Sequence, residues 1–256
     1  MTGSPTTVAV VRDADLLAET VAARLLTALV DAQARRGTAS VVLTGGGVGI
    51  AALVAVRRSG ARQAVDWRQV DLWWGDERYV PADDPERNER QAREALLDSL
   101  DLDPARVHPM GALGGPDGDD VDAAAARYAE ELRRAAPPDH EVPPFDVLLL
   151  GMGAEGHTAS IFPESPAAHD DRLVVGVHGC PKPPPTRISL GLRALNAARE
   201  VWFAVAGRDK APMVAMALGG AGPVQVPAAG VRGRTATLWL LDEAAASALP
   251  RDLRRR

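Results

Sequence analysis

The chain has 256 residues, a formal net charge of -5 and 46% hydrophobic residues. This length is enough for one large core, so we expect a single α/β domain over residues 1–256, and the lack of a basic surplus argues against a nucleic-acid partner. Cys180 is the only cysteine, which excludes an internal disulfide and a cysteine-based zinc site and fits a reducing compartment.

Short β-branched or leucine-rich runs alternate with alanine-rich helical patterns along most of the chain. In chain order we expect strands at 8–11, 40–44, 70–74, 147–150, 173–177, 201–205 and 237–241, and helices at 14–36, 49–58, 86–98, 121–135, 209–218 and 243–249. This alternation is typical of a Rossmann-like α/β fold, a mostly parallel sheet covered by helices on both faces. Loops rich in Gly, Pro and Asp flank the helix at 121–135, which we interpret as a small helical insertion.

Nothing in the sequence indicates a membrane or an export signal. Residues 1–7 lack a basic segment followed by an apolar core. The longest apolar stretch, 41–56, is interrupted by glycines, so we interpret it as strand, loop and helix rather than a membrane span. We therefore expect a cytoplasmic protein with no membrane contact, and no feature indicates an obligate protein partner.

Glycine-containing loops follow four of the predicted strands, at 45–47, 75, 151–153 and 207. If these strands are parallel, their carboxyl ends lie at one edge of the sheet, and the four loops face one crevice. Open α/β sheets bind their ligands at such an edge. This crevice is the predicted site.

Residues in two of these loops are suited to an anionic ligand. Backbone N–H groups of Gly45, Gly46 and Gly47 could approach a phosphate at the start of the following helix, although a tight packing turn explains the glycines equally well. Arg78 and Arg187 lie beside candidate loops, and a guanidinium matches phosphate oxygens with two parallel hydrogen bonds. Together these residues favour an anionic substrate.

His157 is the candidate base, because it lies just past the buried strand at 147–150 and a neutral imidazole suits general-base catalysis near neutral pH. Glu155 either orients this ring or caps the next helix. Asp76 and Glu77 are adjacent acids that could take part in the site. A purely structural role is the alternative, in which one of them pairs with Arg78 or with the start of a neighbouring helix.

Several common motifs are absent or incomplete. Residues 151–156 match the dinucleotide fingerprint G-x-G-x-x-G, but the next predicted strand does not end in the acid that would bind a ribose. The sequence contains no G-x-S-x-G turn for a serine nucleophile and no H-E-x-x-H pair for zinc. We therefore expect neither a nicotinamide cofactor nor a metal.

Two long blocks of the sequence resemble the 6-phosphogluconolactonase family. The first is 74–81, Trp-Gly-Asp-Glu-Arg-Tyr-Val-Pro, followed by Asp84 and Asn88. The second is 151–163, which contains Gly-Met-Gly, Gly-His-Thr-Ala-Ser and Phe-Pro. Shorter blocks at 182–190 and 207–211 agree in order and spacing, so the resemblance covers nearly the whole chain.

The resemblance implies hydrolysis of a small sugar-phosphate lactone, 6-phospho-D-glucono-1,5-lactone, without a cofactor. His157 would deprotonate the attacking water, with Glu155 and Asp76 as further members of the catalytic group. Arg78 and Arg187 would bind the phosphate and so fix which carbonyl meets the base.

Other substrate contacts follow from the same resemblance. Asn88 lies in the first matching block, and Lys210 matches the family's lysine, which either touches the ligand or pairs with an acid. The oxyanion donors are N–H groups at 45–47 or near Gly153, and the sequence does not choose between them.

The sequence departs from the family pattern at two places. The usual Gly-Gly-Ser-Thr-Pro is replaced after Gly46 by Gly-Val-Gly at 47–49, so contacts there rely more on the backbone. The usual aspartate before Gly-His is Glu155, which is longer by one methylene.

Two other functions fit parts of the sequence. Glucosamine-6-phosphate deaminases share this fold, but they carry an acid where this chain has Phe162 and a tyrosine where it has Arg78. A sugar-phosphate sensor that regulates transcription would need a DNA-binding module, and the first predicted strand leaves no room for one before it. We therefore rank both behind the lactonase.

Overall fold

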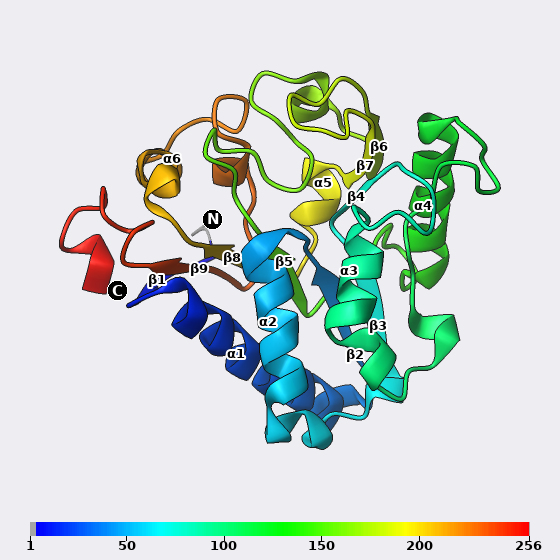
Figure 1. The fold of residues 1–256 in the computed structure, drawn as a ribbon, viewed down its shortest axis with the longest axis horizontal. Coiled ribbons are helices and arrows are strands. Elements are labelled where there is room, and N and C mark those ends of the chain that lie inside the picture. The colour runs from blue at the N-terminus through cyan, green and yellow to red at the C-terminus, as the bar shows by residue number, and fades with distance from the viewer. Residues whose placement is uncertain (1–3, 256) are drawn as a thin grey trace.

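The computed structural model describes residues 4–255. Its main sheet has six strands in the order β1-β9-β8-β5-β2-β3, and every neighbouring pair is parallel (Figure 1). The strands are β1 (Thr6–Val11), β2 (Ala39–Leu43), β3 (Val70–Trp74), β5 (Val147–Leu150), β8 (Glu200–Val205) and β9 (Ala236–Asp242). This confirms the predicted Rossmann-like α/β class. A single domain over 1–256 stays a prediction, and residues 1–3 and 256 lie outside the described part.

The helices are α1 (Ala14–Arg36), α2 (Gly46–Arg58), α3 (Asn88–Ala95), α4 (Val121–Ala135), α5 (Leu192–Leu195) and α6 (Ala211–Leu218). Local chemistry explains the bounds of α1: the Asp13 side chain accepts a hydrogen bond from the N–H of Leu16, and Gly37 ends the helix at φ 79°. Within residues 4–255, no helix combines the length and apolar character needed to cross a membrane.

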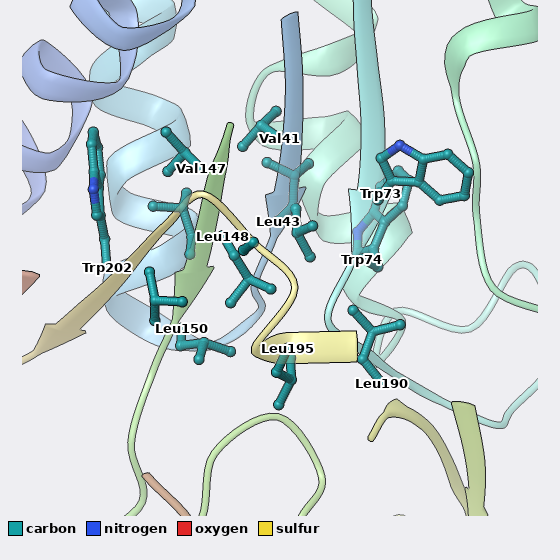
Figure 2. Packing of buried hydrophobic residues seen from close by; sticks show 14 of the residues in the cluster. Val41, Leu43, Trp73, Trp74, Val147, Leu148, Leu150, Leu190, Leu195 and Trp202 are labelled. Atoms are coloured by element: carbon teal, nitrogen blue, oxygen red, sulfur yellow. The ribbon is translucent and has the colours of Figure 1, made fainter. Parts of the chain in front are cut away.

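Helices cover both faces of the main sheet. Figure 2 shows the segment that follows α5, the helix that carries Leu195, in front of β5, with α2 behind β5. Because both faces are covered, every residue of β2 and β5 is buried, as expected for central parallel strands. Strands β2 and β5 are therefore closed to water along their length, and the glycine loops follow their carboxyl ends.

A second, three-stranded antiparallel sheet differs from the prediction. It contains β4 (Asp76–Arg78), β7 (Arg187–Leu190) and β6 (Val174–Val177), in the order β4-β7-β6. The strand expected at 173–177 belongs here and not to the parallel sheet, and neither β4 nor β7 was predicted. Both are short and partly polar, so they lack the apolar run by which a strand is found in sequence. The predicted insertion, α4, packs against β6.

The remaining differences concern helix bounds. The predicted helix at 243–249 is wrong: the segment forms turns, and the Asp242 carboxylate accepts from the N–H groups of Ala245 and Gly207. Helix α2 begins three residues earlier than predicted, at Gly46. The predicted helices at 86–98 and 209–218 are each divided into an α-helix and a 3₁₀ turn.

Candidate active site

Loops after β2, β3, β5 and β8 line one cavity of about 370 Å³. Strands β2 and β5 are neighbours in the sheet. The strand order continues from β2 to β3 in one direction and from β5 to β8 in the other, so it reverses between β2 and β5. Ligands bind in α/β sheets at such a reversal of strand order. The cavity wall contains every predicted site residue except Glu155, namely Gly45, Gly46, Gly47, Asp76, Arg78, Asn88, His157, Arg187 and Lys210.

The glycine loop leaves the start of α2 open to a ligand. Gly45 is the N-cap and supplies no side-chain cap, and the first turn contains no acidic residue. Gly46 has φ +82°, a conformation that favours glycine. A Cβ on Gly45 would overlap the Asn88 side chain, so a larger residue there would displace Asn88. The N–H groups of this turn can therefore bind an anion.

Arg78 and Arg187 are directly opposite each other in the antiparallel pair β4–β7. Like charges in that register destabilise a sheet, and neither guanidinium forms an ion pair with a carboxylate in the part of the chain described. Arg78 donates to Oδ1 of Asn88 (2.6 Å), and its buried Nε has no hydrogen-bond partner among residues 4–255. Arg187 donates to the backbone oxygens of 182–184. A bound anion would neutralise both charges.

His157 lies in the turn after β5, where its ring stacks on Phe162 with centroids 4.4 Å apart. Nδ1 is 3.0 Å from Oε1 of Glu155, within ion-pair distance although not aligned as a hydrogen bond. Burial lowers the pKa of His157, and the nearby Glu155 carboxylate only partly opposes this effect. The ring is therefore neutral at pH 7 and can accept a proton.

Glu155 lies behind His157 rather than on the cavity wall. It also accepts from Nζ of Lys182 at 2.9 Å. Burial acts to raise the pKa of Glu155, but the Lys182 hydrogen bond and the neighbouring charges lower it on balance, so the group is a carboxylate at neutral pH. The alternative that Glu155 caps a helix is wrong, because turns follow it.

Asp76 connects two walls of the cavity. Its carboxylate accepts from Oγ of Ser160 at 2.7 Å, three residues after His157, and its backbone oxygen accepts from Nδ2 of Asn88 at 2.8 Å. The acid does not pair with the Arg78 guanidinium. Asp76 thus joins the arginine-bearing strand to the histidine loop.

A family model described as glucosamine-6-phosphate isomerases/6-phosphogluconolactonase matches residues 12–239. The chain belongs to this family. It is 62% identical to the 6-phosphogluconolactonase of Streptomyces coelicolor, with 94% of each chain covered. It is 53% identical to that of Mycobacterium tuberculosis, over 93% of this chain and 96% of the relative.

Solved structures share the family fold. The 6-phosphogluconolactonase of Trypanosoma brucei superposes with a TM-score of 0.82 at 27% identity, over 97% of this chain and 100% of that chain. A monomeric glucosamine-6-phosphate deaminase gives a TM-score of 0.76 at 18% identity, over 94% of this chain and 99% of that chain. At that identity the deaminase shows the fold alone.

Two lysines of this family member line the cavity. Lys210 pairs with Asp209 at 2.6 Å, which is one of the two predicted alternatives. Lys182 was not among the predicted site residues, although it lies in a block that resembles the family. Its proximity to Glu155 depends on how the 182–185 loop folds, which local sequence does not show. The signal available in the sequence was a positive charge next to prolines.

We expect Gly153→Ala to impair the site around His157 without unfolding the protein. A Cβ on Gly153 would overlap the His157 ring and lie 2.6 Å from Oε2 of Glu155. A 1 Å misplacement of a catalytic group costs about 10²-fold in rate, so we expect a loss of that order in the activity of this site. Gly60→Ala is the control, because no atom of the described residues lies within 4 Å of its added Cβ. Equal activity of the two variants would contradict the placement of His157.

Proposed function

We propose that this chain hydrolyses 6-phospho-D-glucono-1,5-lactone to 6-phospho-D-gluconate, a step of the oxidative pentose phosphate pathway. The observation that carries the proposal is a pair of arginines opposite each other in β4 and β7, which have no carboxylate partner among residues 4–255, with a partly buried, neutral histidine in the same cavity. The arginines suit a phosphate, and the histidine suits a water-activating base. The curated relatives named above carry the same activity in their names.

His157 acts as the general base. Because Nδ1 faces Glu155, Nε2 is the nitrogen left to take a proton from water as the water oxygen attacks C1 of the lactone. The bond from C1 to the ring oxygen then breaks, and the imidazolium returns the proton to that oxygen, which leaves as the C5 hydroxyl. Glu155 stabilises the imidazolium between these two transfers.

Backbone N–H groups stabilise the negative charge that develops on the carbonyl oxygen. Candidates are the uncapped start of α2 at Gly46 and Gly47 and the turn at 151–153, all on the cavity wall. Such donors are fixed before the reaction and need no rearrangement. Arg78, Arg187 and Lys182 then remain for the phosphate.

The pH dependence follows from the state of His157. The active form is the neutral ring, and burial places its pKa below the ordinary value of about 6.5. We therefore expect kcat/KM to stay level from pH 8 to below pH 6.5 and to fall only in more acidic solution. Glu155→Gln removes the charge that raises the pKa of His157, so kcat/KM of this variant should fall at a still lower pH. A pH-rate profile corrected for spontaneous hydrolysis tests both, and a limb centred above 6.5 contradicts them.

The deaminase alternative is disfavoured by Phe162. This side chain stacks on His157 at the position where the deaminase pattern has an acid, so the ring-opening proton transfer lacks its donor. Purified protein offered freshly generated lactone should release acid faster than the spontaneous reaction. Offered glucosamine 6-phosphate, it should release no ammonia. Ammonia release without lactone hydrolysis would reject the proposal. If the protein showed neither activity, a binding-only domain would be favoured.

The setting proposed for this enzyme is the cytoplasm, without an obligate protein partner. Cys180, the only cysteine of the chain, is free and buried, and a free thiol suits a reducing compartment.

A further inference from the structure

Glu77 is a fully buried acid between two cavity residues, Asp76 and Arg78, and does not itself line the cavity. The three residues form β4, in which successive side chains point to opposite faces. Asp76 and Arg78 face the cavity, so Glu77 faces the interior on the other side. The proposed reaction assigns it no role.

The Glu77 carboxylate is bound on every side. Oε1 accepts from the backbone N–H groups of Arg78 (2.8 Å) and Asn88 (2.7 Å), and Oε2 accepts from the N–H of Glu89 (2.9 Å). The Arg87 guanidinium lies 3.6 Å from Oε2, and both side chains are almost completely buried. Arg87 is the N-cap of α3 but supplies no capping hydrogen bond, so Glu77 caps this helix from the neighbouring strand.

This cap determines where Asn88 lies. Asn88 is the first residue of α3, and its amide accepts from Nη1 of Arg78 (2.6 Å) and donates to the backbone oxygen of Asp76 (2.8 Å). A chain of contacts therefore leads from the Glu77 carboxylate through the start of α3 to the Arg78 guanidinium. The carboxylate binds the backbone of Arg78 and of Asn88 at once, which fixes the spacing between them.

Burial of this acid is unfavourable by itself. Loss of solvation raises the pKa of Glu77 to about 7 despite Arg87 and the three N–H groups. An apolar residue would avoid that cost but would leave the N–H groups of Asn88 and Glu89 without acceptors. We therefore interpret Glu77 as a residue that holds the start of α3 in place.

We propose that Glu77 is a positioning residue for substrate binding, which sets the Arg78 guanidinium and the Asn88 amide at the phosphate end of the cavity. The inference rests on the proposed function. It predicts that Glu77 acts on the affinity for phosphorylated ligands and acts through Arg78.

The test is a double-mutant cycle of Glu77→Gln and Arg78→Ala. Gln keeps an oxygen for the N–H groups of Arg78 and Asn88, but its NH2 group faces the N–H of Glu89 and the Arg87 guanidinium. We expect KM for the lactone to rise about tenfold, with kcat within about twofold, since His157 is untouched. In the Arg78→Ala background the same change should alter KM by less than about twofold.

One control and one replacement variant separate this role from a loss of stability. Thr237→Val removes a buried hydrogen bond from the N–H of Gly233 at the amino end of β9, and we expect it to lower stability without changing KM. If Glu77→Gln does not fold, Glu77→Asp, which keeps the charge but shortens the reach, takes its place in the cycle.

Additive effects of the two changes on KM, or a fall in kcat at constant KM, would overturn the inference while leaving the proposed function intact. If the wild type does not hydrolyse the lactone, the proposed function fails. The cycle is then read from the affinity for inorganic phosphate by calorimetry. Non-additive loss of phosphate affinity supports the positioning role, and additive loss overturns it.

Discussion

His157→Asn should lower kcat for lactone hydrolysis by a factor of about 10²–10⁴, the usual contribution of general acid–base catalysis. Asn retains a polar side chain that can lie beside Phe162, but its amide cannot accept a proton at neutral pH. The phosphate end of the cavity is unchanged, so KM and the affinity for 6-phosphogluconate should change little. Initial rates corrected for spontaneous opening, together with product binding by calorimetry, measure both quantities.

The control for this variant is His140→Asn, because His140 is exposed and its ring Nδ1 lies 3.1 Å from the backbone oxygen of the neighbouring Pro138. It should match the wild type. If His157→Asn kept more than about a tenth of the wild-type kcat, His157 would not be the base, since loss of the base should cost at least about 10²-fold.

Arg187→Met should raise KM for the phosphorylated lactone about 10- to 100-fold, because a hydrogen bond to a charged group contributes about 1.5–3 kcal/mol and 1.4 kcal/mol corresponds to a factor of ten. Met preserves much of the apolar stem. Arg78→Met should act in the same direction. Since both changes remove contacts to phosphate, hydrolysis of glucono-1,5-lactone, which has no phosphate, should hardly change.

The measurement is therefore the ratio of kcat/KM for the two lactones. Arg24→Met, on the exposed face of α1, should leave this ratio at the wild-type value. If Arg187→Met reduced hydrolysis of both lactones equally, the arginine would serve the structure rather than the phosphate.

The main sheet could be predicted because its central strands are covered on both faces. Runs such as 147–150 are then apolar at every position, and glycines mark where each strand leaves the sheet. Parallel strands bring those glycines to one edge, so the positions of Gly45, His157 and Arg78 around one cavity follow from topology alone.

The second sheet could not be predicted from the same pattern. Strand β4 is Asp-Glu-Arg directly after Gly75, and its polar residues are stabilised by the start of α3 and by β7, which is distant in sequence. The register that sets Arg78 opposite Arg187 depends on this pairing. The Lys182–Glu155 contact likewise joins residues 27 positions apart. Local sequence carries no signal for such contacts.

The most direct test of the central claim is a structure with the product, 6-phosphogluconate, bound. We expect its phosphate within hydrogen-bond distance, about 3 Å, of the Arg78 and Arg187 guanidinium groups. The C1 carboxylate should lie beside the His157 ring, with an oxygen toward the N–H groups at 45–47 or 151–153. A phosphate bound away from both arginines, or a C1 carboxylate out of reach of His157, would contradict the account.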